Sequence, residues 1–330
     1  MASAFGSRFV AHMTVSRYRG GKWSPAEVEP LAALELHPAA HGLHYGSTCF
    51  EGLKAYRHVD GSVHVFRLDR HIERMRSSAR LLCLPVPEPQ LLADLVWRLV
   101  EASRTEVPPE PDSLYLRPVL AGDEPNIGGA TSPASEALLY AIASPVGDYF
   151  AGGDRPLKLL IEDRAMRTTP EFGQVKTGGN YAAALGRVLA ARREFDADQV
   201  LFCPGGDVQE TGAANFLLIR DGAILTKPLD GSILPGVTRD SVLRLADAAG
   251  YRIDERNFSI AEMLDWIADG EAALSGTAVV LAGVGSLLHA GKEYPAGRGG
   301  VGAHTRRLRE HLHAIRTGRA SDTFGWLTRV

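Results

Sequence analysis

The stretch "GQVKTGGNYAAAL" (residues 173–185) places a lysine three residues after one glycine and two residues before a pair of glycines. An asparagine, a tyrosine and a run of alanines follow. Glycines allow the backbone to turn tightly and to approach a bound ring closely. Lys176 is therefore compatible with three roles: a phosphate-binding lysine, a covalent anchor for a cofactor, or a solvated lysine beside a structural turn.

The spacing excludes the first role. A phosphate-binding loop of the Walker type requires GxxxxGK[ST], and the residue before Lys176 is Val175. A covalent anchor requires a lysine that can lose its proton, which desolvation favours. We expect Asn180 to cap a helix with an apolar stripe of Tyr181, Leu185, Val188 and Leu189. Taken alone, this segment favours a structural turn over an anchor.

Composition sets broad limits on the class of protein. The 330 residues are 45% hydrophobic and 23% charged, as in a soluble globular protein, and are long enough for two domains. The net charge of −3 argues against a nucleic-acid partner. We interpret the basic stretch 306–319 as a solvated helix.

Cysteine usage and hydropathy predict a location. Cys49, Cys83 and Cys203 are scattered without CxxC spacing, which favours a reducing compartment. The N-terminal stretch has no apolar core of a signal peptide, and no run of 18 apolar residues occurs. We expect a cytoplasmic protein with no membrane partner.

A metal site is considered at "HPAAHGLHYG", where His37, His41 and His44 have a spacing that suits a metal on a helix. Pro38 and Gly42 disfavour a continuous helix there, so we expect no metal.

The organisation predicted along the chain is a mixed α and β protein. Residues 68–84 have helical periodicity, with Asp69 as the N-cap, and Asp221-Gly222 predicts a hairpin. Residues 234–250 predict a helix that ends at Gly250. The Gly, Asp and Pro cluster at 150–156 predicts a connection between domains 1–149 and 157–330.

Further residues fit one cofactor, pyridoxal phosphate, which needs a lysine for its aldehyde, an acid for its pyridine nitrogen and donors for its phosphate. Glu210 precedes an apolar strand, where burial without a partner is unfavourable; a surface glutamate is the alternative. The predicted phosphate donors are a helix start at Val237 and Thr238 and a turn at Thr277. Arg74, beside Met75 on its helix, is either an inward phosphate ligand or a solvated arginine.

Eight blocks in order give the chain a family resemblance: "LHYGSTCFEGLKAYR" (43–57), "FRLDRHIERMRSSARLLCLP" (66–85), "SLYLRPVLAGDEPNIG" (113–128), "SPVGDYF" (144–150), "KTGGNY" (176–181), "ETGAANF" (210–216), "SILPGVTRD" (232–240) and "SGTA" (275–278). The chain resembles the branched-chain amino acid aminotransferases, which are fold-type IV pyridoxal-phosphate enzymes. The resemblance implies an α+β fold with a smaller α/β N-terminal domain and a larger C-terminal pseudo-barrel domain.

The resemblance also implies residue roles. Lys176 becomes the catalytic lysine that carries the cofactor, Tyr181 contacts the ring oxygen, and Glu210 binds the pyridine nitrogen. The phosphate is bound by Arg74, Val237, Thr238 and Thr277. Substrate contacts are implied for Phe5, Tyr45, Tyr115, Arg117, Ile127, Tyr149 and Ala278, with Arg117 facing the side-chain carboxylate of glutamate and Ile127 supplied by the partner of a homodimer.

The implied reaction is transamination between branched-chain L-amino acids and 2-oxoglutarate, which gives branched 2-oxo acids and L-glutamate. A D-amino acid aminotransferase, an aminodeoxychorismate lyase and an aminotransferase of shifted substrate range are alternatives with the same fold. A non-enzymatic protein of this fold is a further alternative, although Lys176 and Glu210 are both present. Three departures from the family pattern are visible. Ala213 replaces a hydroxyl, Gly129 is expected to enlarge the pocket, and Val279 and Ala282 stand where a CxxC thiol pair would fall.

Overall fold

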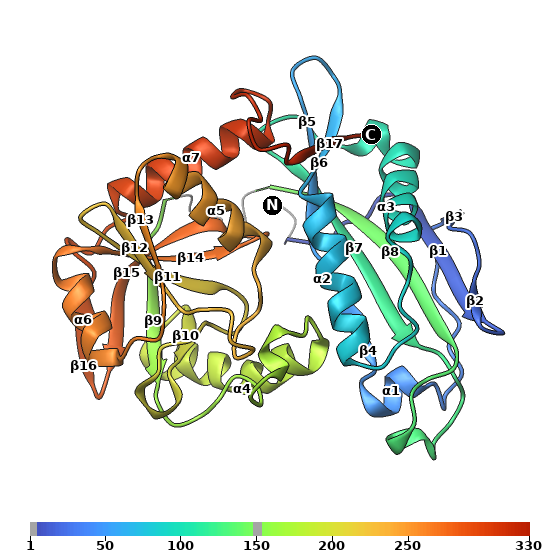
Figure 1. The fold of residues 1–330 in the computed structure, drawn as a ribbon, viewed down its shortest axis with the longest axis horizontal. Coiled ribbons are helices and arrows are strands. Elements are labelled where there is room, and N and C mark those ends of the chain that lie inside the picture. The colour runs from blue at the N-terminus through green and yellow to red at the C-terminus, as the bar shows by residue number, and fades with distance from the viewer. Residues whose placement is uncertain (1–4, 148–153) are drawn as a thin grey trace. The chain divides into compact units, whose positions relative to one another are not determined.

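A computed structural model describes residues 5–147 and 154–330 (Figure 1). The chain divides into two compact units. Unit 1 contains Met1–Tyr149, Val175–Gly178 and Ile315–Val330, and unit 2 contains Phe150–Gln174 and Gly179–Ala314. The lysine segment is thus packed with unit 1, although unit 2 surrounds it in the sequence. The predicted domain boundaries at 149 and 157 stay a prediction, and part of the predicted connection, 150–153, lies outside the described residues.

Unit 1 is built on a nine-stranded antiparallel sheet with the order β17-β6-β5-β7-β8-β1-β2, in which β3 pairs with β1 and β4 with β7. Its strands are β1 (His12–Arg19), β2 (Lys22–Trp23), β3 (Glu27–Pro30), β4 (Thr48–Phe50), β5 (Leu53–Arg57), β6 (Val63–Phe66), β7 (Ser113–Gly122), β8 (Ala137–Val146) and β17 (Leu327–Arg329). Its helices are α1 (His41–Tyr45), α2 (Leu68–Leu81), α3 (Pro89–Ala102), η1 (Arg104–Glu106) and η2 (Gly129–Thr131).

The helices α2 and α3 cover one face of this sheet (Figure 1). Strand β7 shows the alternation of side chains that this packing requires. Leu114, Leu116 and Leu120 lie in the core formed with α2 and α3. Tyr115 and Arg117, the intervening residues, therefore point to the opposite face of the sheet.

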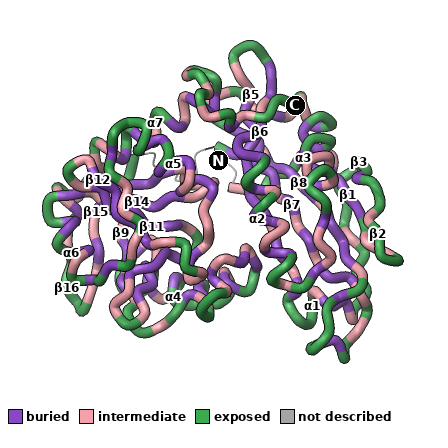
Figure 2. Tube along the Cα trace, in the orientation of Figure 1, coloured by how far each residue is buried: buried purple, intermediate pink, exposed green. Residues whose placement is uncertain are grey.

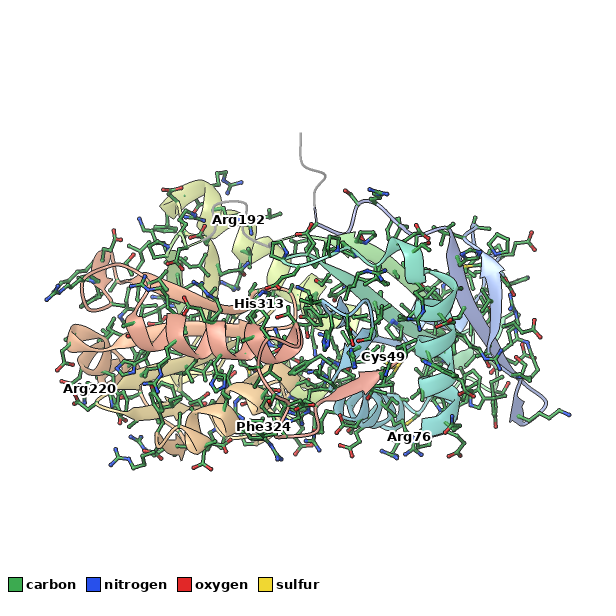
Figure 3. The ribbon with its side chains drawn as sticks, turned by 90° about the horizontal axis from the view of Figure 1, so that it is seen from above. Cys49, Arg76, Arg192, Arg220, His313 and Phe324 are labelled. Atoms are coloured by element: carbon green, nitrogen blue, oxygen red, sulfur yellow. The ribbon has the colours of Figure 1, made fainter. Side chains whose placement is uncertain are left out.

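The C-terminal segment completes unit 1. Strand β17 pairs with β6, and the backbone N–H of Arg67 donates to the carbonyl of Trp326 at 2.7 Å. Phe324, labelled in Figure 3, stacks on Trp326 with 4.2 Å between ring centroids. This segment is therefore fixed against the start of α2.

Unit 2 contains an eight-stranded mixed sheet with the order β10-β9-β15-β14-β11-β12-β13, in which β16 pairs with β15. Its strands are β9 (Leu157–Glu162), β10 (Gln199–Phe202), β11 (Asn215–Arg220), β12 (Ala223–Thr226), β13 (Arg252–Glu255), β14 (Glu271–Gly276), β15 (Val280–His289) and β16 (Lys292–Pro295). The remaining helices are α4 (Gly178–Phe195), α5 (Val237–Ala248), α6 (Ile260–Asp269), α7 (Ala303–Arg316), η3 (Phe172–Gln174) and η4 (Pro204–Gly206).

Side chains pack on both faces of the unit 2 sheet, and its strands β11, β12 and β14 are almost wholly buried, whereas β13 and β16 are partly exposed (Figure 2). On one face, Val200 and Phe202 of β10 pack against alanines and Val188 of α4. On the other, Leu201 packs in the core that includes Met263 of α6. Among the helices of the described residues, none is both long and apolar enough to cross a membrane.

Two local predictions are confirmed. Asp221 (φ 50°) and Gly222 (φ 69°) join β11 to β12, as expected of a two-residue hairpin turn with both φ values positive. The helix predicted at 234–250 is α5, and Gly250 adopts a left-handed φ of 85° after its C-terminus.

Two capping predictions and the stripe prediction are wrong. The N-cap of α2 is Arg67, with φ 51°, and Asp69 lies in the first turn. Asn180 lies inside α4, which begins at Gly178. The buried face of α4 consists of Ala184, Val188 and Ala191, because these small residues fit against β10, and Leu185 and Leu189 are exposed. The face of α4 that packs on the sheet is therefore the face with small side chains and not the face with the leucines.

Candidate active site

The segment that carries Lys176 is attached to unit 1 by its backbone. The N–H of Lys176 donates to the Ser78 Oγ on α2 at 3.1 Å, and its carbonyl accepts from the N–H of Phe50 at 3.0 Å. The Lys176 Nζ lies 5.0 Å from the centroid of the Phe50 ring. These contacts position the lysine between the end of β4 and the C-terminal half of α2.

Arg74 is buried on the same helix and forms a bidentate ion pair with Glu51. The Arg74 Nε donates to Glu51 Oε1 at 2.7 Å, and Nη2 donates to Oε2 at 2.8 Å. The same carboxylate accepts from His71 Nδ1 at 2.7 Å and from the backbone N–H of Gly52 at 3.1 Å. Because a carboxylate only accepts, the hydrogen of His71 is on Nδ1. Burial of Arg74 excludes the solvated alternative.

The electrostatics of this cluster follow from burial. Burial alone would raise the pKa of Glu51, but Arg74 and His71 outweigh it through charge and hydrogen bonds and hold the pKa well below its ordinary value. Burial lowers the pKa of His71 below 6.5, and Glu51 opposes this effect, whereas Arg74 and Lys176 add to it. At neutral pH the cluster therefore contains an ionised Glu51 and a neutral His71.

Two aromatic rings enclose Arg117. Its guanidinium lies 4.6 Å from the centroid of Phe50 and 5.2 Å from that of Tyr115, and its Nη2 donates to the Tyr115 hydroxyl at 2.8 Å. Phe5 meets the Tyr115 ring edge-on at 5.2 Å. A Cβ on Gly52 would lie 2.0 Å from the Tyr115 hydroxyl, so only glycine admits this tyrosine. The result is an aromatic wall on which the guanidinium of Arg117 lies.

The segment predicted to reach a partner subunit is exposed. Ile127 is 71% exposed, and its carbonyl accepts a hydrogen bond from the Tyr45 hydroxyl. Gly129 does not open space, contrary to our expectation, because a Cβ there would lie 2.9 Å from the His41 ring. Tyr149, the remaining predicted substrate contact of unit 1, lies outside the described residues.

The histidine at the centre of the suspected metal motif has other partners. His41 is buried, with Nδ1 2.7 Å from the Ser47 hydroxyl and Nε2 3.0 Å from the Gly129 carbonyl. Within residues 5–147 and 154–330, no group of three His, Cys, Asp or Glu residues is arranged to hold a metal ion. Here His41 connects α1 to the segment that contains Gly129.

Glu210 of unit 2 is buried, which excludes the surface alternative. Its Oε1 accepts from the Leu234 N–H at 2.9 Å and pairs with Arg167 Nη2 at 2.6 Å. Its Oε2 accepts from Asn215 Nδ2 at 2.8 Å. Because both oxygens accept from donors, the carboxylate is fixed in orientation.

The predicted anion site at the start of α5 lies next to this network. Val237 and Thr238 are the first two residues of α5, where N–H groups have no partner within the helix. A Cβ on the N-cap, Gly236, would lie 2.0 Å from Asn215 Oδ1. The helix start therefore touches the amide that holds Glu210.

A second turn of unit 2 contains Thr277 and Ala278 and joins β14 to β15. Val280, at the end of this turn, has φ 59°, a strained conformation for a β-branched residue. Ser275 pairs with Asn215 across the sheet, and its buried hydroxyl has no hydrogen-bond partner in the described part of the chain. An unsatisfied buried hydroxyl beside a strained turn is typical of a ligand site.

Several residues of these clusters were not predicted from the sequence. The polar residues Glu51 in "CFEG" and Asn215 in "NFLLI" interrupt apolar stretches, and this interruption is the signal that identifies them. His71 is detectable by its place one turn before Arg74. Nothing in the local sequence distinguishes Arg167. Tyr181 lies in the first part of α4, five residues after Lys176.

Comparison with known proteins decides the family. The class IV amino-transferase family matches residues 48–287. The chain belongs to the class IV aminotransferases. It is 38% identical over 316 residues to branched-chain amino acid aminotransferase 2, chloroplastic, of Humulus lupulus, with 94% of this chain and 76% of that protein covered.

Bacterial and structural relatives agree. A branched-chain-amino-acid aminotransferase of Mycobacterium tuberculosis (strain ATCC 25618 / H37Rv) is 37% identical over 340 residues, covering 99% of this chain and 92% of that protein. The crystal structure of a T.th. branched-chain amino acid aminotransferase with pyridoxamine 5'-phosphate has a TM-score of 0.80 at 26% identity and covers 97% of this chain and 99% of that one. These findings confirm the predicted family and the α+β fold of fold type IV.

Close packing at Gly236 generates a stability prediction. Gly236→Ala forces a Cβ onto Asn215 and is expected to lower the free energy of unfolding by about 1–3 kcal/mol, as overpacking does. The matched control is Gly186→Ala in α4, where the new Cβ meets open space and stability rises by about 0.5–1 kcal/mol. Urea unfolding measures both. Equal effects of the two variants contradict the close packing.

The buried cluster predicts a loss of stability in acid. Above pH 6.5 His71 is neutral in both states and imposes no penalty; below it the unfolded chain takes up a proton that the folded chain resists, so stability falls. Glu51 adds a second loss as pH falls below 4.5. Because the chain has 11 histidines, the test compares wild type with His71→Asn, which keeps the donor. If the unfolding free energies of wild type and His71→Asn fall in parallel between pH 7 and pH 5, His71 is not the cause of the loss of stability.

Proposed function

We propose that this protein transfers amino groups between branched-chain L-amino acids and 2-oxoglutarate with pyridoxal 5'-phosphate as cofactor. The observation that carries the proposal is the packing of Lys176 against α2, the helix that also presents the buried Arg74. The Lys176 segment and the Arg74 guanidinium, a group that can bind phosphate, are thereby attached to the same helix. Membership of the class IV aminotransferases supports the same conclusion.

The residues of both units fit the parts of the cofactor. In unit 1, Lys176 is the covalent anchor and Arg74 a phosphate ligand. In unit 2, Glu210 binds the pyridine nitrogen and Tyr181 contacts the ring oxygen. The further phosphate ligands of unit 2 are the N–H groups and hydroxyls at the start of α5 and in the turn after β14: Val237, Thr238 and Thr277. The buried Ser275 hydroxyl, which has no hydrogen-bond partner among the described residues, fits a polar ligand.

When bound, the cofactor supplies an aldehyde that captures the substrate amine and a ring that accepts the electrons released at the substrate Cα. Lys176 Nζ, freed when the incoming substrate amine takes its place, would accept the proton from the substrate Cα and deliver it to the former aldehyde carbon of the cofactor. Glu210 keeps a proton on the pyridine nitrogen, since its carboxylate is fixed by Arg167, Asn215 and Leu234.

The substrate side must accept an apolar chain in one half-reaction and a carboxylate in the other. Phe5 and Tyr115 provide the apolar contact, and Arg117 binds the carboxylate of glutamate. The stacking of Arg117 on Phe50 and Tyr115 leaves it the flat, weakly hydrated cation that such a double role needs. The N–H of Ala278 is proposed to bind the α-carboxylate.

The exposed segment around Ile127 and Tyr45 suits a role across a homodimer, in which the partner's copy of this loop closes the pocket. Leu43, 62% exposed, extends the same apolar surface. We further propose a cytoplasmic location, because Cys49, labelled in Figure 3, and Cys203 are free thiols, as is usual in reducing compartments.

Replacement of the anchor tests the function directly. Lys176→Ala is expected to lower the rate of leucine transamination by at least about 10³-fold, as removal of an essential nucleophile does. Borohydride should no longer link the cofactor covalently to the protein. The exposed Lys292 offers a matched control, and Lys292→Ala should behave as wild type. A Lys176→Ala variant with near-normal activity disproves the proposal.

Arg117→Met tests the dual pocket by separating the half-reactions. Loss of a charged hydrogen-bond partner typically costs about 1.5–3 kcal/mol, so the half-reaction with glutamate should slow by roughly 10–150-fold. The half-reaction with leucine needs no positive charge and should change by less than about threefold. Single-turnover rates with each amino acid measure the difference. An equal loss for both assigns Arg117 to support of the pocket wall instead.

A further inference from the structure

Glu51 makes contacts that the proposed chemistry does not explain. It is almost completely buried, 1% exposed, and occupies the Nε and Nη2 hydrogens on one edge of the Arg74 guanidinium. A guanidinium is planar and rigid, and its second edge is formed by Nη1 and the other Nη2 hydrogen. A carboxylate that fixes the first edge also fixes the plane and the direction of the second.

The surroundings make this fixation strong. Beside Glu51 and His71 lies a cavity of about 10 Å³ whose other walls are apolar: Leu53, Leu68, Ile72, Met75, Leu92, Val96 and Pro118. Ion pairs in such low-dielectric surroundings are strong, and separation of the charges is costly. Arg74 therefore has no favourable rotamer away from Glu51.

His71 and Gly52 complete the arrangement from two further elements. Nδ1 of His71 comes from α2 one turn before Arg74, and the Gly52 N–H comes from the chain after β4. Each donates to Oε2, so Glu51 itself cannot rotate. His71 and the Gly52 N–H thus fix the orientation of the Glu51 carboxylate, and the carboxylate fixes the orientation of the Arg74 guanidinium.

We propose that Glu51 is a positioning residue that directs the second edge of the Arg74 guanidinium toward the phosphate group of the cofactor. The inference rests on the proposed function, in which Arg74 binds that phosphate. The affinity of the protein for the phosphate group then depends more on the orientation of the Arg74 guanidinium than on the net charge of the cluster.

Charge and orientation predict opposite results for Glu51→Gln. The substitution removes one negative charge from the cluster, so attraction for an anion rises if charge dominates. The same substitution weakens one of the two charged hydrogen bonds and removes the other, because the amide NH2 of glutamine cannot accept from Arg74. The guanidinium is then held less firmly, so phosphate affinity falls if orientation dominates. Our proposal requires the second result.

A neighbouring contact supplies a contrast. Ser78, one turn after Arg74 on α2, binds the backbone of Lys176. Ser78→Ala is expected to disturb the lysine segment, so any loss should be the same for a cofactor with or without a phosphate group. Glu51→Gln should affect only the phosphate-bearing form.

The experiment titrates the full chain, freed of cofactor, with pyridoxal 5'-phosphate and separately with pyridoxal, and follows the absorbance of bound cofactor. For Glu51→Gln we expect the Kd for pyridoxal 5'-phosphate to rise at least about tenfold and that for pyridoxal to change less than about threefold. Tighter binding of pyridoxal 5'-phosphate, or an equal loss for both compounds, overturns the proposal. A wild-type chain that binds neither compound overturns the proposed function itself.

A double variant keeps the test valid if Glu51→Gln folds poorly. Glu51→Gln combined with Arg74→Gln removes both charges, so that neither is left buried without its partner. If Glu51 acts through Arg74, the double variant binds pyridoxal 5'-phosphate no more weakly than Arg74→Gln alone. An additive loss in the double variant overturns the proposal, because Glu51 then acts independently of Arg74.

Discussion

A buried carboxylate must be neutralised and fully hydrogen-bonded, and in unit 1 this requirement falls on Glu51. Its donors come from α2 and from the backbone after β4, which fixes the rotation of α2 about its axis. The same rotation places Ser78 under the Lys176 segment. Hydrophobic packing holds α2 against the sheet, and the charge of Glu51 determines that the helix turns His71 and Arg74 toward this carboxylate.

Unit 2 meets the same requirement at Glu210 by different means. Here the donors are a loop N–H, a strand amide and Arg167, and the close approach of Gly236 to Asn215 links this carboxylate to the start of α5. In both units a Cβ on the glycine beside the cluster would collide with a polar side-chain atom, the Tyr115 hydroxyl at Gly52 and Asn215 Oδ1 at Gly236. Each carboxylate accepts hydrogen bonds at both oxygens, so its orientation is set by the fold.

The sequence predicted those features that depend on neighbours in the chain. The hairpin at Asp221-Gly222 and the end of α5 at Gly250 follow from local backbone preferences. The pairs Glu51–His71 and Arg167–Glu210 join residues far apart in the chain, and no periodicity reports such contacts. Two wrong predictions in α4 show the opposite limit, because tertiary contacts overrode the local pattern. Asn180 does not cap the helix, since its side chain bonds to Thr168 and to the Phe172 carbonyl, and Leu185 is exposed because the alanine face of α4 packs against β10.

The order of the segments in unit 1 has a consequence for the synthesis of the protein on the ribosome. Val175–Gly178 and Ile315–Val330 belong to the same unit as Met1–Tyr149, and β17 pairs with β6. Domains usually fold one after another from the N-terminus during synthesis. Here unit 1 stays incomplete until β17 has been translated, so this strand is added only after unit 2 has been synthesised. A nascent chain must protect the unpaired edge of β6 throughout that interval.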